Sequence, residues 1–197
     1  DDWYAKDDAR RFVPIKNSWK GFSGTFDGGC HTLRGVIIEG SEFRSDQPCG
    51  IFPYADNATV KNLTIDGFYV CSNNTTRLPV FGRGGIGGLF GSVIGNVTID
   101  NVTMKNGTVT ALEGAKGALG GLIGSYYGVL SAEERQAGKT LNVSITNTTV
   151  EESVKLVKGT SSVDYEGGVF GYIEGNFQAH PTFIDFSASK IQPSGSM

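Results

Sequence analysis

The sequence contains few charged residues, few prolines and few cysteines. Of its 197 residues, 19% are charged, 6 are proline and 3 are cysteine, and the formal net charge is −3. A slightly negative chain without a basic patch is not expected to bind nucleic acid or an anionic membrane surface. The longest apolar stretches are interrupted by glycine and polar residues before they reach membrane-spanning length, so no membrane insertion is expected.

Cysteine is too scarce for a disulfide framework or a structural zinc site. The cysteines are Cys30, Cys49 and Cys71, an odd number that cannot all pair within one chain, and none belongs to a CxxC pair. No metal site is therefore predicted. Cys49 and Cys71 stand one apparent repeat apart, so two interpretations remain open: a disulfide between neighbouring turns of the chain, or two buried free thiols.

The motifs of several enzyme classes are also missing. There is no HExxH metalloprotease motif, and "AGKT" at 137 is not a phosphate-binding loop because Glu133 stands where its first glycine is required. Neither the multi-aspartate set and Gly-His-Gly element of polygalacturonases nor the arginine pattern of polysaccharide lyases is evident. We therefore expect a protein that is not an enzyme and that needs no cofactor.

Glycine, in contrast, is abundant. The chain has 29 glycines without the period of collagen, which indicates many tight turns. A glycine-apolar segment recurs as "CGIFPY" at 49, "GGLFGS" at 87, "GGLIGS" at 120 and "GGVFGY" at 167. Each copy precedes an asparagine-apolar segment: "NLTIDGFYV" at 62, "NVTIDNVTM" at 96, "NVSITNTTV" at 142 and a shorter "NFQA" at 176. Recurrence of this kind is typical of a repeat protein.

The spacing of these segments gives a period of about 33 residues, which is typical of known repeat architectures. Asn96 lies 8 positions after Gly88, whereas Asn142 lies 21 positions after Gly121, so the later repeat contains an insertion of 13. Asn96 also lies 34 positions after Asn62. Asn62, Asn96 and Asn142 therefore align at one repeat position, where a stacked ladder of amides could fix a turn and satisfy its backbone groups.

Within each repeat, apolar and polar residues alternate as in a β-strand. Val97 and Ile99 share one face, and Val102 and Met104 continue the alternation one residue out of step. Such a shift would move the apolar side chains to the other face of a straight strand, so the chain must bend near 100–101. Short strands joined by corners predict an all-β fold, a parallel β-solenoid of about four to five coils that bury their inner faces by stacking.

The inserted segment carries the one helical pattern in the sequence. Ser131 and Glu134 have capping-box spacing, and Gly138 could end a short helix after one or two turns. Insertions in repeat proteins often carry recognition, and aromatic rings can stack on sugars. We therefore predict a short helical insertion at 125–140 that carries a binding site. Its predicted residues are Tyr126, Tyr127, Glu133 and Arg135.

The segment "GTFDGGCHTL" at 24 contains a carboxylate, a thiol and an imidazole close together. A cysteine nucleophile needs a histidine beside it, but adjacent residues of an extended strand point to opposite faces, so Cys30 and His31 would point apart. We interpret Asp27 and His31 as residues that fix a turn. The thiol of Cys30 is expected to be buried or bridged.

The same segment is part of a resemblance to a known repeat. "FSGTFDGGCHTLRGVII", followed by "GIFPYADNATVKNLTI" and by "GGLFG" with "NVTI", is similar to the glycine-rich GLUG motif, which typically reads F-x-G-T-F-D-G-x-G-H-T-I and then G-L-F-G. The resemblance covers about 18–176, and Cys30 stands where the family usually has glycine. It implies a right-handed β-helix of the kind present in large bacterial cell-surface proteins, including adhesins and regions beside surface IgA-cleaving metallopeptidases.

These observations divide the chain into three parts. Residues 1–21 lack the repeat and are predicted to be an N-terminal cap segment, 22–176 hold the β-solenoid repeats with the insertion 125–140, and 177–197 hold a final strand and a C-terminal tail. Solenoid ends need a cap, and an uncovered end can pair with another strand.

The expected function is that of an extracellular structural or adhesive module, secreted or attached to the cell surface. The expected partners are a host or matrix glycan or protein, or neighbouring copies in a surface assembly. The alternative is a carbohydrate-active β-helix enzyme, either a polysaccharide lyase or a glycoside hydrolase. Such an enzyme would need convergent carboxylates from neighbouring coils.

Overall fold

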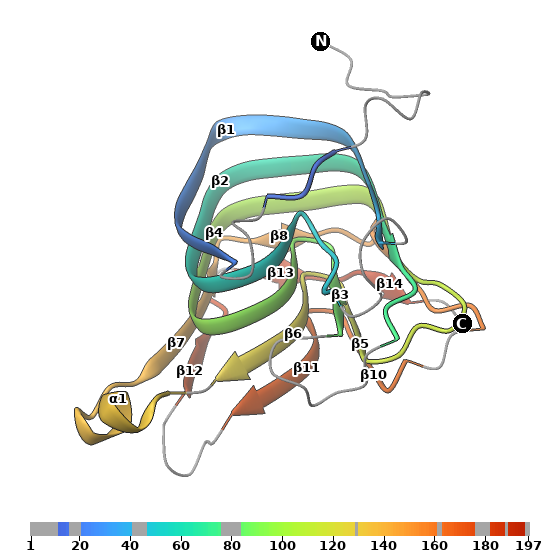
Figure 1. The fold of residues 1–197 in the computed structure, drawn as a ribbon. Coiled ribbons are helices and arrows are strands. Elements are labelled where there is room, and N and C mark those ends of the chain that lie inside the picture. The colour runs from blue at the N-terminus through green and yellow to red at the C-terminus, as the bar shows by residue number, and fades with distance from the viewer. Residues whose placement is uncertain are drawn as a thin grey trace.

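A computed structural model describes residues 12–15, 21–40, 47–75, 84–128, 130–160, 163–175, 182–187 and 189–195. Apart from one short helix, the regular structure in these ranges is β-strand, and the strands pair in parallel. In Figure 1 the long strands of the sheet lie over one another and bend around a common interior. The predicted all-β fold of parallel strands with one short helical insertion is confirmed. The helix in the described ranges is much too short to cross a membrane.

The main sheet is built from long strands first and short strands later in the chain. Its order is β1 (Phe22–Glu39), β2 (Phe52–Ser72), β4 (Phe90–Ala111), β6 (Ile123–Gly128) and β11 (Phe170–Gly175). Further along β4 its partners are β7 (Leu141–Thr146), β8 (Thr149–Val150) and β9 (Lys155–Val157), which pair in turn with β12 (Thr182–Asp185), β13 (Lys190–Ile191) and β14 (Ser194–Gly195). A second sheet has the order β10 (Tyr165–Gly167), β5 (Ala118–Gly120) and β3 (Gly85–Gly87), and α1 spans Ala132–Gln136.

The long strands bend where single residues adopt a left-handed backbone conformation. In β2 these residues are Asn57 (φ 54°), Asn62 (φ 53°) and Gly67 (φ 72°), and in β4 they include Asn101 (φ 54°) and Asn106 (φ 52°). Asparagine tolerates this conformation better than most residues because its short side chain can hydrogen-bond locally. The bend predicted near 100–101 is confirmed. Corners five or six positions apart leave short straight segments between them and reset which side chains point inward.

The interior is filled by side chains that repeat from one strand to the next. Val60, Ile99 and Ile145 are in register on β2, β4 and β7 and are fully buried. The ring of Phe52 lies 4.9 Å from that of Phe22 and 5.3 Å from that of Phe90, centroid to centroid. The inner faces of neighbouring strands therefore bury one another.

The repeated glycines allow the backbone to fold back on itself. A Cβ atom on Gly87, Gly120 or Gly167 would lie 2.0, 1.9 or 2.1 Å from the carbonyl oxygen of the residue three positions later. Real Cβ atoms do not approach so closely, so only glycine fits at this turn. The recurrence of the glycine-apolar segment thus has a steric cause.

The two terminal parts of the predicted division are described only partly. Of the N-terminal cap segment 1–21, all but residues 12–15 and Gly21 lie outside the described residues, and the amide of Ile15 donates to the carbonyl of Ile51 at 2.8 Å. In the C-terminal part 177–197, the described ranges hold β12, β13 and β14 where one final strand was predicted. These three strands extend the main sheet past β7, β8 and β9.

Opposite charges alternate across the outer face of the sheet. Asp27, Lys61 and Asp100 are in register on β1, β2 and β4, and Lys61 Nζ lies 3.3 Å from Asp27 Oδ2. A second column contains Arg34, Asp66 and Lys105. A slip of β2 by five positions, in one direction or the other, would place Asp27 opposite Asp66 or Arg34 opposite Lys61. These columns therefore favour the observed pairing.

Two aspartates in this sheet make stability depend on pH. Hydrogen bonds from the Gly29 amide and then from Asn62 lower the pKa of Asp27, and those from Asn147 and Thr146 lower that of Asp100. A folded-state pKa below the unfolded value of 3.8 gives stability that is complete above that value and is lost as pH falls through the folded pKa. We expect the thermal midpoint to fall across the acid range below about pH 3.8.

Thermal unfolding followed by circular dichroism across this range tests the prediction. The double variant Asp27→Asn, Asp100→Asn should show a shallower decline than the wild type. An equally steep decline in the double variant would assign the acid sensitivity to other groups.

Candidate functional site

Three stacked asparagines form one corner of the main sheet. The backbone amide and Nδ2 of Asn96 donate to Asn57 Oδ1 at 3.0 and 2.9 Å, and the backbone amide of Asn142 donates to Asn96 Oδ1 at 2.8 Å. Asn96 and Asn142 therefore share a corner, as predicted. The third member is Asn57, which lies 39 residues before Asn96.

Asn62 belongs to the next corner along the chain, so its alignment with Asn96 was wrong. Its Nδ2 donates to Asp27 Oδ1 at 3.0 Å, and its Oδ1 accepts from Asn101 Nδ2 at 2.9 Å. The alignment made from the sequence was displaced by one corner, because each long strand has several similar corners five or six positions apart. Asn62 is a turn residue, but in a different ladder.

The segment around Asp27 is also a corner. Asp27 Oδ1 accepts from the backbone amide of Gly29 at 3.0 Å, which holds the turn as predicted. The left-handed residues are Gly29 (φ 58°) and Cys30 (φ 61°), and His31 begins the next straight segment opposite Leu63. His31 is exposed, and it lies one residue beyond the left-handed pair that makes the turn. Cys30 is exposed as well, so the expectation of a buried or bridged thiol was wrong.

Cys49 and Cys71 are buried thiols and are not joined by a disulfide. Cys49 Sγ donates to the backbone oxygen of Cys71 at 3.5 Å. Burial raises the pKa of Cys49 to about 12, which keeps this thiol protonated and unreactive. Of the two interpretations, the structure has the pair of buried thiols.

The placement of Tyr126 and Tyr127 on a surface loop was wrong. Both lie in β6, which pairs with β4 on one side and β11 on the other, and their side chains are 0% and 2% exposed. Tyr126 packs edge-on against Phe170 at 6.2 Å, and Tyr127 lies 6.0 Å from Tyr172. Their rings are therefore not available for stacking on a ligand in this conformation.

The insertion itself begins after β6. Ile94 and Val97 of β4 pair with Tyr127 of β6 and Val143 of β7. β4 passes this corner in 3 positions, whereas the chain needs 16 positions to pass it from β6 to β7. The added length is the one the sequence predicts, but the inserted residues start later than 125. The segment contains α1, where Glu133 and Arg135 are exposed.

The predicted capping box holds α1 in place. The Glu134 amide donates to Ser131 Oγ at 3.1 Å, and the Ser131 amide donates to Glu134 Oε2 at 3.0 Å. Gly138 follows the helix with φ 68°, as expected for a residue that ends it. The insertion is therefore an ordered feature with its own hydrogen bonds.

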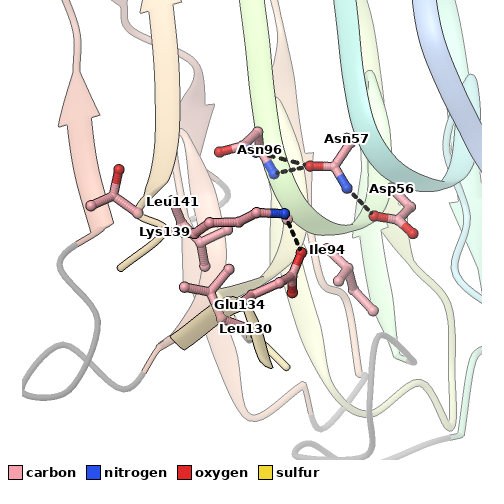
Figure 2. Close-up of a pocket in the computed structure, with 10 residues that line it drawn as sticks. Asp56, Asn57, Ile94, Asn96, Leu130, Glu134, Lys139 and Leu141 are labelled. Carbon is pink, nitrogen blue, oxygen red and sulfur yellow. Dashed lines mark hydrogen bonds and ion pairs between the residues drawn. The ribbon is translucent and has the colours of Figure 1, made fainter. Parts of the chain in front are cut away.

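A pocket lies between the insertion and the asparagine corner (Figure 2). Its volume is about 440 Å³, within the range of ligand sites. One wall comes from β2 and β4 and the other from the insertion and the start of β7. The lining residues are Asp56, Asn57, Ile94, Gly95, Asn96, Leu130, Glu134, Lys139, Thr140 and Leu141.

The two carboxylates of the pocket have pKa values displaced in opposite directions. Burial, with a smaller contribution from Glu134, raises the pKa of Asp56 against the hydrogen bond from Asn57. The Ser131 amide and Lys139 lower the pKa of Glu134, whose Oε1 lies 3.4 Å from Lys139 Nζ. The lining therefore combines hydrogen-bond acceptors and donors with three apolar residues, Ile94, Leu130 and Leu141.

Sequence reasoning found the insertion but missed most of the residues that it places together. Glu134 was recognised only as a capping residue and Asn96 only as a turn residue, while Asp56, Asn57 and Lys139 were not selected. The signal for Lys139 was its position at the end of the insertion. Asp56 lies 83 positions before it in the sequence, and only the strand register brings the two walls together.

No family model, curated protein or solved structure matches this chain. Within the described ranges, no group of three or more histidine, cysteine, aspartate or glutamate residues converges as a metal site. The candidate site is therefore assigned from its geometry alone.

Removing the helix cap should loosen one wall of the pocket. In Ser131→Ala the amide of Glu134 loses its acceptor, a change that costs about 1 kcal/mol at a helix N-terminus. We expect the α1 amides of Arg135 and Ala137 to exchange with solvent about fivefold faster in native-state hydrogen exchange. Unchanged exchange at these amides would show that the capping box does not hold the insertion.

Proposed function

We propose that the chain is a right-handed parallel β-helix that acts as an extracellular structural and adhesive module of a cell-surface protein. The observation that carries this proposal is the insertion between β6 and β7, which folds as a capped helix over one corner of an otherwise regular stack and forms a polar pocket there. Stacked, in-register strands give a rigid support, and inserted loops are where such proteins place recognition.

Several features support the proposal. The resemblance to the GLUG repeat implies bacterial surface proteins and a β-helix. The parallel pairing of β1, β2 and β4, with corners in register, is compatible with successive coils. The proposed partners are a host or matrix glycan or protein, or neighbouring copies of the chain.

A binding screen with a loop deletion tests the proposal. Replacing 128–141 with one glycine gives the sequence Tyr127-Gly-Asn142-Val143, which copies the Ile94-Gly95-Asn96-Val97 corner of β4 and removes the whole inserted length. Wild type should bind at least one immobilised glycan or host or matrix protein, and the deletion variant should lose that binding while it keeps its β-sheet circular dichroism. Equal binding by the variant, or no binding by wild type, would contradict the proposal.

A carbohydrate-active enzyme is the second candidate, and one observation favours it. Asp56 and Glu134 line the same pocket and have pKa values displaced in opposite directions, as in pairs of acid and base. Incubation with a panel of polysaccharides, followed by measurement of new reducing ends and unsaturated products, separates the candidates. Turnover that is lost in Asp56→Asn would replace the adhesive function with the enzymatic one.

A further inference from the structure

The hydrogen-bonding capacity left in the pocket indicates what it can hold. Glu134 uses one oxygen for the Ser131 amide and the other for Lys139 Nζ. An ammonium group has three protons, so Lys139 has two more to donate. Asp56 accepts from Asn57 Nδ2 at 2.8 Å through Oδ1, and Oδ2 has no partner among the described residues. Figure 2 shows the Lys139 ammonium group and the Glu134 carboxylate beside the asparagine corner, and Asp56 on the other side of Asn57.

The walls that carry these groups are fixed before any ligand arrives. Asn57 and Asn96 are held in the corner ladder by bonds of 2.8 to 3.0 Å, and the capping box holds α1. Binding therefore needs little ordering of the asparagine corner or of α1, which favours affinity. Lys139 is 60% exposed, so its ammonium group can turn toward a ligand at the mouth of the pocket.

The geometry points to a binding site for an uncharged saccharide unit, held between Asp56 and Lys139. Hydroxyl groups of a sugar can donate to Asp56 Oδ2 and accept from Lys139 Nζ, and the sugar ring can contact the half-buried side chain of Ile94. This inference rests on the proposed adhesive function and names the ligand class of that same site.

The charges select against the other small ligands. Two carboxylates and one ammonium give the lining a net negative charge, which disfavours uronic acids and sulfated sugars. An amine would meet the positive charge of Lys139 and only one carboxylate oxygen without a protein partner. A neutral polyol matches both the donors and the acceptors that remain.

A glycan array with ligand-observed nuclear magnetic resonance tests the inference. The array carries neutral, uronic-acid-containing and sulfated oligosaccharides, and saturation transfer is then measured with the methyl glycosides of the neutral sugars that bind, with methyl glucuronide and with butylamine. Wild type should bind neutral saccharides in preference to the charged probes. Asp56→Asn and Lys139→Met should each weaken that binding at least tenfold. Glu152→Gln, which removes an exposed carboxylate outside the pocket lining, should bind as wild type does.

The outcomes separate the ligand class from the proposed function. A neutral saccharide that binds wild type and both pocket variants equally would overturn the site, and preferential binding of the amine or of an acidic sugar would overturn the ligand class. If no neutral saccharide binds but a host or matrix protein does, and the loop deletion abolishes that binding, the adhesive function stands and the saccharide inference fails. Circular dichroism of each variant confirms that a loss of binding is not a loss of folding.

Discussion

Gly120→Ala should destabilise the protein by more than about 3 kcal/mol and should reduce the yield of folded chain. A Cβ atom at this position would lie 1.9 Å from the carbonyl oxygen of Ile123 and 2.8 Å from the amide nitrogen of Gly171. Both neighbours are backbone atoms in stacked strands, so the clash cannot be relieved by rotating a side chain. The thermal unfolding midpoint of purified protein measures the effect.

Gly114→Ala is the matched control for this experiment. Gly114 has φ 79°, and no atom lies within 4 Å of the place that a Cβ would occupy, so the substitution introduces only backbone strain. That strain costs about 1 kcal/mol. Equal midpoints for Gly120→Ala and Gly114→Ala would show that the glycine-apolar segments are not close-packed turns.

Phe52→Ala should cost about 3–5 kcal/mol because it removes the centre of an aromatic stack. Phe52 is fully buried, and its ring lies 4.9 Å from Phe22, 5.5 Å from Phe26 and 5.3 Å from Phe90. The cavity would lie between three successive long strands that cannot move closer without breaking their hydrogen bonds. Urea unfolding followed by circular dichroism gives the loss in free energy.

Phe186→Ala makes the same chemical change on the surface. Phe186 is 42% exposed and contacts Phe170 edge-on at 6.4 Å. Its truncation should cost less than about 1 kcal/mol. A Phe52→Ala variant no less stable than Phe186→Ala would mean that the three long strands do not share one core.

Local patterns in the sequence predicted the local structure well. The alternation of Val97 and Ile99 with polar residues predicted a strand, and its change of phase predicted the corner at Asn101. The spacing of Ser131 and Glu134 predicted the helix cap, and the repeat arithmetic gave the length of the insertion. The strand, the corner and the helix cap depend on interactions within a few residues, and the insertion length follows from the comparison of two repeats.

Register between strands was not predictable in the same way. Asn57 and Asn62 both precede an apolar-Thr pattern, and each is followed five positions later by another left-handed residue. The sequence alone does not distinguish which corner stacks on Asn96. Backbone hydrogen bonds, inward packing and the column of Asp27, Lys61 and Asp100 decide it together.

The pocket and the two buried tyrosines could not be predicted for the same reason. Tyr126 and Tyr127 look exposed when the insertion is assumed to begin at 125, but β6 continues through them because β4 and β11 pair with it. Asp56 and Lys139 line one pocket only because two strands and an insertion meet at one corner. Such sites are produced by the stacking of distant segments.

The register that stacks Asn57 on Asn96 builds the corner on which the insertion folds. Disulfide mapping in a Cys30→Ser background tests it directly. Thr64 and Thr103 are in register, so the pair Thr64→Cys, Thr103→Cys places the two new thiols within disulfide reach. The pair Thr64→Cys, Thr98→Cys follows the alignment of Asn62 with Asn96 suggested by sequence and places a corner between the thiols. We predict that mild oxidation of the folded protein links only the first pair, as detected by peptide mass mapping. A link in the second pair with the first left reduced would show that Asn62, and not Asn57, stacks on Asn96.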